Sequence, residues 1–103
     1  FASTTRGCIA GGMDASSGTL RDQIDYITIA STGNSTDFGD LISTKALPAG
    51  CANPTRAVFA GDANSSNVIE YVTIASTGNS TDFGDLIVGT GWNSGCSSQH
   101  GGL

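Results

Sequence analysis

The feature that most constrains this chain is an internal repeat. Residues 26–42 read YITIASTGNSTDFGDLI and residues 71–87 read YVTIASTGNSTDFGDLI, so the two segments differ only at Ile27 and Val72. The second segment follows the first at an offset of 45 residues, and a Gly-Cys pair at 50–51 recurs at 95–96 with the same offset. A period of about 40 to 50 residues with several short strands per unit is typical of β-propeller blades.

Each repeat also has an upstream element, RGCIAGG at residues 6–12 and RAVFAGD at 56–62. The runs around both tyrosines are rich in β-branched and aromatic residues, which favour strands, and the STGNS segments favour turns because Gly and Asn accept positive φ. We therefore predict an all-β fold with two four-stranded blades. The predicted strands are residues 5–10, 24–30, 36–42 and 46–51, then 55–60, 68–75, 81–88 and 92–96, with a polar surface loop at 13–21. A β-solenoid is the structural alternative.

The same residues carry a resemblance. The segment 56–62, followed by a strand with a tyrosine and a return strand with Trp92 or Leu47, resembles the kelch-like β-propeller repeat; Gly11-Gly12 keeps the double glycine of that pattern and Asp62 departs from it. The ASTGNSTDFGDL units are similar to tandem repeats of marine bacteriophage structural or tail proteins. The resemblance implies a propeller and a virion or extracellular location.

Two blades cannot cover both of their own faces, and propellers usually have about four to eight blades. We expect a head-to-tail homo-oligomeric ring, with six blades from a homotrimer preferred and eight from a tetramer as the alternative; a longer single chain would meet the same need. The whole chain, 1–103, is predicted to be one unit with repeats at about 1–51 and 52–96. The C-terminal strand at 92–103 is expected to complete the first blade of a neighbouring chain.

Charge and composition exclude several classes of protein. The net charge is −5 with only four basic residues, so no basic patch for a nucleic-acid backbone is expected. No apolar run approaches the roughly 18 residues that a membrane-spanning helix needs. The spacings of Cys8, Cys51 and Cys96 match no zinc motif. We expect small buried apolar cysteines rather than a disulfide framework, and no metal or other cofactor.

Catalytic residues are not evident. The one histidine, His100, stands in a glycine-rich tail that would not hold a Ser-His-Asp arrangement, so we predict that the chain is not an enzyme. Aspartates recur in the two DFGD units, at Asp37, Asp40, Asp82 and Asp85. Their carboxylates could coordinate a calcium ion, but the favoured interpretation is that they cap turns by accepting hydrogen bonds from backbone N–H groups.

Aromatic rings, amides and carboxylates are also the groups that bind sugars. The candidate ligand-binding residues are Trp92, Arg56, Asn34, Asn79, Asp37 and Asp82, whereas Tyr26, Tyr71, Phe38 and Phe83 are predicted to belong to the core. The preferred function is a non-enzymatic structural or interaction module associated with a virion. The alternative is a multivalent, lectin-like propeller that binds glycans, for instance on a host-surface receptor, at sites between blades.

Overall fold

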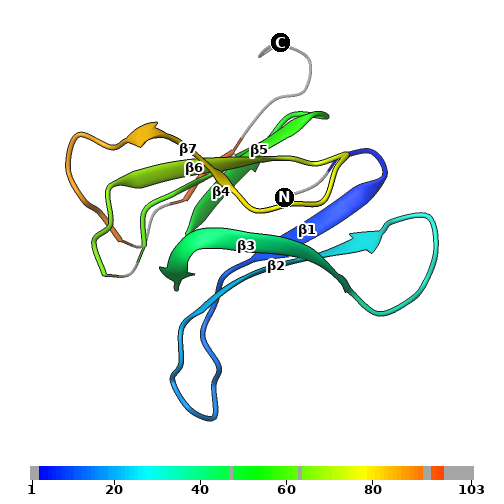
Figure 1. Ribbon diagram of the computed structural model, residues 1–103, viewed down its shortest axis with the longest axis horizontal. Coiled ribbons are helices and arrows are strands. Elements are labelled where there is room, and N and C mark those ends of the chain that lie inside the picture. The colour runs from blue at the N-terminus through cyan, green and yellow to red at the C-terminus, as the bar shows by residue number, and fades with distance from the viewer. Residues whose placement is uncertain (1–2, 47, 63, 92–93, 97–103) are drawn as a thin grey trace.

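The computed structural model describes residues 3–46, 48–62, 64–91 and 94–96, and over these ranges the fold is all-β, as predicted. Two antiparallel sheets lie against each other (Figure 1). The first contains β1 (Arg6–Ala10), β2 (Arg21–Thr28) and β3 (Thr36–Lys45), in that order. The second contains β4 (Ala49–Ala52), β5 (Arg56–Ala60), β6 (Val68–Thr73) and β7 (Thr81–Asp85). The described residues form no helix that could cross a membrane.

The two repeats fold alike down to the strand register. Cys8 lies opposite Tyr26 in the first sheet, and Val58 lies opposite Tyr71 in the second. The register of β2 on β3 shifts after Ile24, and that of β6 on β7 shifts after Ile69.

A glycine stands opposite the residue at each of these shifts. Gly39 has φ 146° and Gly84 has φ 150°, a backbone region that side-chain-bearing residues rarely adopt. The glycine of each DFGD unit is thus required by the bulge in its strand pair.

The distribution of strands between the sheets differs from the prediction of two four-stranded blades. The strand predicted at 46–51 forms β4 and pairs with β5, so in the described part of the chain the first sheet has three strands and the second has four. The chain crosses over at Ala46, whose N–H donates to Asp62 Oδ1 (2.7 Å). The predicted return strand at 92–96 is not a strand over its described residues, 94–96, and Trp92 lies outside them.

The predicted loop at 13–21 is also more regular than expected. Met13 forms a β-bridge with Leu20, and Asp14 N donates to Thr19 O (2.9 Å). The antiparallel pairing of the first hairpin therefore extends beyond β1, and β2 begins at Arg21 rather than at Ile24.

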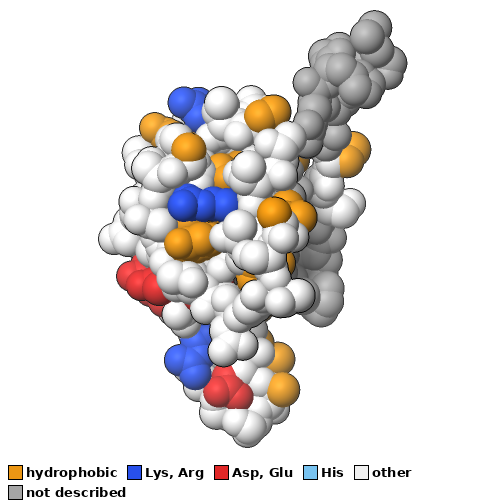
Figure 2. All heavy atoms as spheres, turned by 90° about the vertical axis from the view of Figure 1, so that its right-hand side faces the viewer, with side chains coloured by type: hydrophobic (Ala, Val, Ile, Leu, Met, Phe, Trp, Pro, Cys, Tyr) orange, Lys and Arg blue, Asp and Glu red, His pale blue; other side chains and the backbone are white. Residues whose placement is uncertain are grey.

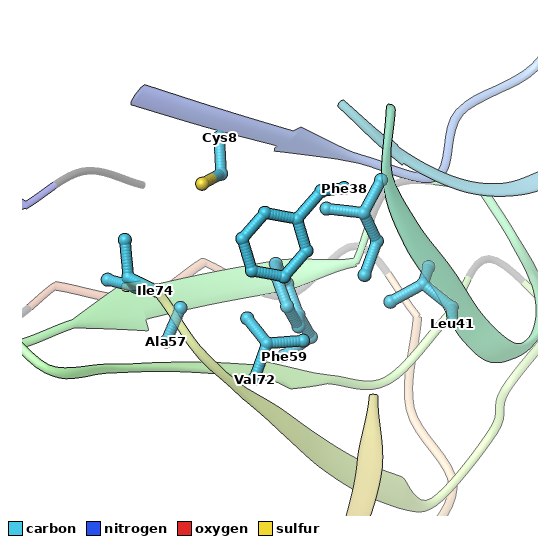
Figure 3. Packing of buried hydrophobic residues seen from close by; sticks show 8 residues of the cluster. Cys8, Phe38, Leu41, Ala57, Phe59, Val72 and Ile74 are labelled. Carbon is cyan, nitrogen blue, oxygen red and sulfur yellow. The ribbon is translucent and has the colours of Figure 1, made fainter. Parts of the chain in front are cut away.

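The core lies between the two sheets (Figure 3). One face of the first sheet packs on one face of the second, and each large apolar side chain buried there contributes about 1.5–3 kcal/mol. The first sheet supplies Cys8, Ile24, Phe38 and Leu41, and the second supplies Ala57, Phe59, Val72 and Ile74. The core is thus a single apolar layer at the contact between two repeats.

Candidate interaction surfaces

We call the contact between the two sheets the junction. Besides its apolar layer, it has a row of hydrogen bonds along the outer edge of β3. In the loop between β6 and β7, Gly78 N donates to Phe38 O (2.7 Å) and Ser80 N donates to Asp40 O (2.8 Å). The Asn79 side chain lies between them and accepts from Asp40 N (3.1 Å). The loop therefore satisfies the edge of β3 much as a further strand would.

A buried carboxylate completes this row. Glu70, on β6, is fully buried, and its Oε2 accepts hydrogen bonds from Ile42 N (3.0 Å) and from Ser80 Oγ (3.2 Å). Its Oε1 has no hydrogen-bond partner, and neither has the Nζ of the fully buried Lys45, within the described ranges. Removing charged groups from water without partners is costly, so these two atoms are the least satisfied part of the junction.

An arginine repeats on each sheet. The guanidinium carbon of Arg6 lies 4.4 Å from the centre of the Tyr26 ring, and that of Arg56 lies 4.4 Å from the Tyr71 ring, a favourable cation–π arrangement. Arg6 also crosses the junction, where its Nη1 donates to Ile74 O (2.8 Å). Arg56 is exposed, and no hydrogen bond from its side chain to another described residue is present.

The prediction that these aromatic residues belong to the core is confirmed only in the first sheet. Phe38 is buried and Tyr26 packs against the core cluster, whereas Tyr71 lies outside that cluster and Phe83 is 55% exposed. Each tyrosine ring is nevertheless in contact with an arginine and with a phenylalanine of its own sheet. Tyr26 meets Phe38 edge to face, and Tyr71 meets Phe83 with the same centroid distance of 6.0 Å and the same interplanar angle of 82°. These stacks hold the aromatic groups within their own sheets. A sugar that stacks on the arginine-covered face of either tyrosine would have to displace that arginine.

The predicted ligand-binding residues lie in several different elements. Asp37 and Asp82 each accept the backbone N–H two residues ahead, from Gly39 (3.2 Å) and Gly84 (3.1 Å). The favoured interpretation predicted such bonds to backbone N–H groups, but they lie at the bulges within β3 and β7 rather than in turns. Asn79 is used in the junction, while Asn34 occupies the equivalent place in the exposed loop between β2 and β3. Trp92 lies outside the described residues. In the described ranges no group of three or more His, Cys, Asp or Glu side chains is placed to hold a metal ion.

The cysteines differ in environment. None of the three is in a disulfide in the described structure; Cys8 is buried, Cys51 is partly buried and Cys96 is exposed. Burial raises the pKa of the Cys8 thiol, which keeps it protonated and less reactive. Cys8 therefore behaves as the small core residue that was predicted, whereas the same prediction is wrong for Cys96, which is exposed, and only partly met by Cys51.

Two apolar faces are left partly or fully uncovered by the junction. The head face is the outer face of the first sheet, with Ile9, Ile27 and Ile29; the tail face is the outer face of the second, with Val58, Tyr71, Phe83 and Leu86. A groove of about 280 Å³ lies at the tail face, where Val58, Ala60 and Leu86 line it together with β4 and with Ser94 and Gly95 of the same chain. Figure 2 shows hydrophobic side chains reaching the surface among mostly uncharged groups, with few acidic or basic side chains.

Each exposed apolar residue on these faces has a buried counterpart in the other repeat. Phe83 is 55% exposed and Phe38 is 2% exposed; Ile9 is 64% exposed and its counterpart Phe59 is 2% exposed. Ile29 is 53% exposed, while Ile74 is 1% exposed. Uncovered outer faces were expected for a chain of two blades, but their residues were not predicted, although the repetition of both the loop and the strand contained the signal.

Comparisons of the chain with protein-family models, with curated proteins and with solved structures found no significant match.

Proposed function

We propose that this chain is a non-enzymatic structural and interaction module, in which blade-like β-sheets associate face to face into a closed, rigid β-propeller. A place on a virion or another extracellular assembly, which the resemblance of the repeat implies, belongs to the same proposal. Its working parts are the junction and the two faces that resemble it, rather than a cleft lined by reactive groups.

The observation that best supports this proposal is that the repeated segment contains both sides of the contact between the sheets. In the second repeat the loop residues Gly78, Asn79 and Ser80 bind the neighbouring sheet, and in the first repeat the strand residues Phe38 and Asp40 receive them. If every repeat uses its loop to bind one neighbouring sheet and its strand to receive the loop of another, every repeat must keep the sequence of both the loop and the strand. This explains why residues 26–42 recur almost unchanged at 71–87.

Carbohydrate binding remains the alternative function, but no contact in the described structure favours it. Of its candidate residues, Asn79, Asp37 and Asp82 already bond the backbone, and Arg56 stacks on Tyr71. Binding of the labelled chain to an immobilised glycan panel, abolished by Arg56→Ala and Asn34→Ala, would replace the structural interpretation with the lectin-like one.

The proposal is tested by the dependence of thermal stability on protein concentration. Association that occurs only between folded chains stabilises them by mass action, so the melting temperature should rise as the concentration rises from about 1 to about 100 μM. The rise should be of several degrees for a domain of this size. A melting temperature that is constant over this range would contradict an assembling module.

A further inference from the structure

We propose that the tail face docks on the head face of a second copy of this chain, and that this contact reproduces the arrangement of the junction. The inference rests on the proposed function and names its partner. It follows from one geometric relation. A single rotation and translation places the second sheet on the first, and the same movement applied once more places the first sheet of another copy on the second sheet.

The apolar layer of the new contact is already present on both surfaces. In the junction, Phe38 and Leu41 of the first sheet are covered by the second sheet. Their repeats, Phe83 and Leu86, lie at the tail face, and Leu86 lines its groove. The side chains that would cover them are Ile9, Ile27 and Ile29 of the second copy, which replace Phe59, Val72 and Ile74. Every replacement is apolar, so the character of the layer is preserved.

The polar row is duplicated as well. β7 is the edge strand of the second sheet, and no loop covers its outer edge in the described part of the chain. Gly33, Asn34 and Ser35 of a second copy are identical to the residues that cover β3. They would bond Phe83 O and the N–H and C=O of Asp85, the repeats of the groups that β3 offers at Phe38 and Asp40.

The buried carboxylate has a counterpart one methylene shorter. Asp25 stands at the position of Glu70, and Ser35 Oγ donates to Asp25 Oδ2 (3.3 Å) as Ser80 Oγ donates to Glu70 Oε2 (3.2 Å). The hydroxyl–carboxylate pair is therefore preformed on the head side. The Asp25 carboxylate of the second copy is placed to accept a hydrogen bond from Ile87 N of the first copy, as Glu70 Oε2 accepts one from Ile42 N in the junction.

Arg56 supplies a further bond from the tail side. Its guanidinium lies on the Tyr71 ring as that of Arg6 lies on the Tyr26 ring, and in the junction Arg6 donates a hydrogen bond to Ile74 O. The repeat of Ile74 is Ile29, whose carbonyl belongs to the head side. The exposed guanidinium of Arg56 is thus preoriented for Ile29 O of a second copy.

The equivalence breaks at two places, and both define the new contact. Thr90 stands where the junction has Lys45, so no lysine ammonium is buried between copies. Gly12 stands where the junction has Asp62, so the bond from Ala46 N is not repeated. The contact between copies is therefore less charged than the junction, and it can form and separate without burying a lysine.

Two variants block one face each. Phe83→Asp places a charge in the tail face, and Ile29→Asp places one in the head face; both positions are more than half exposed, so each chain should keep its fold by circular dichroism. Native mass spectrometry is expected to show each variant alone as a single chain. An equimolar mixture should give a two-chain complex, because the intact head face of Phe83→Asp can bind the intact tail face of Ile29→Asp. Ile9→Lys and Arg56→Ala provide a second head and tail pair if either aspartate variant unfolds.

The outcomes separate this inference from the proposed function. If both variants alone assemble as the wild type does, the wild-type chains meet through other surfaces; the head-to-tail inference is then wrong, while an assembling module survives. A mixture that yields no two-chain complex, from folded single-chain variants of an assembling wild type, also overturns it. If the wild type is itself a single chain at every concentration, the inference and the proposed function fall together.

Discussion

Phe38 and Phe83 make the same edge-to-face contact with their own tyrosines, yet Phe38 is buried and Phe83 is more than half exposed. The local sequence around them is identical, so the difference comes entirely from what lies on the other side. Phe38 faces the second sheet, whereas Phe83 faces no further sheet in the described structure. An exposed phenylalanine in the place of a core residue marks a surface that is suited to a partner.

Truncating these two phenylalanines should have unequal effects. Phe38→Ala is expected to lower the free energy of unfolding by about 3–5 kcal/mol, because it opens a cavity in the only apolar layer of the described fold. Phe83→Ala should cost about 1 kcal/mol or less when assembly is prevented by Ile29→Asp, because its side chain is largely solvated. Urea unfolding of both variants in that background measures the difference. Equal losses would contradict the assignment of Phe38 to the core.

The two bulge glycines allow steric clash to be separated from backbone strain. Gly39 and Gly84 have nearly the same φ, so alanine strains both alike. A Cβ at Gly39 would collide with the Gly78 backbone carbonyl, whereas a Cβ at Gly84 meets nothing within 4 Å. We expect Gly39→Ala to destabilise the isolated chain by about 1–3 kcal/mol more than Gly84→Ala. Thermal unfolding that ranks the two variants equally would argue against the close approach of loop and strand.

Asp14 should titrate well below an ordinary aspartate. Hydrogen bonds from the Ser16 hydroxyl (2.7 Å) and Ser16 N–H (2.9 Å), followed by Arg21 (3.2 Å), lower the pKa of Asp14 from 3.8 to about 2. Because the folded-state pKa is depressed, the stability it contributes is present above pH 3.8 and is lost as the pH falls through about 2. Carboxyl NMR should show a midpoint near 2, and Ser16→Ala should raise it. A midpoint near 3.8 would contradict the turn.

Lys45 is a site where an apolar side chain should be preferred. Its ammonium is fully buried and has no hydrogen-bond partner in the described ranges. Lys45→Met keeps the stem and removes the charge, so the free energy of unfolding should rise by about 1 kcal/mol or more. Lys45→Arg is the matched control that keeps a charge, and it should bring no gain. Chemical denaturation of both checks this; a clear loss of stability in Lys45→Met would show that the ammonium stabilises the fold.

The sequence was sufficient to predict the strand content. Runs of β-branched and aromatic residues around Tyr26 and Tyr71 became β2 and β6, and the STGNS segments became the loops that follow them. These are local preferences of the backbone, and they do not depend on distant contacts. Neither Asn34 nor Asn79 has the positive φ that was given as the reason for a turn. The prediction that the DFGD aspartates accept backbone N–H groups is confirmed at Asp37 and Asp82, although both bonds lie within strands rather than in turns.

Long-range pairing could not be predicted in the same way. β4 follows β3 in the chain but joins β5, because Ala46 is bonded to Asp62 in the other repeat. Asn79 was expected to contact a ligand, yet its amide oxygen binds the backbone of Asp40, 39 residues away. Identical segments occupy different environments here, so no property of the segment alone predicts which copy is buried.

The solution mass of the wild-type chain tests the central claim most directly. Light scattering coupled to size-exclusion chromatography should give a mass of two or more 10.3 kDa chains, and a six-bladed ring would have three chains and a mass of about 31 kDa. That mass should be lost in Phe83→Asp and in Ile29→Asp. A wild-type mass of 10.3 kDa at every concentration would contradict assembly through the head and tail faces.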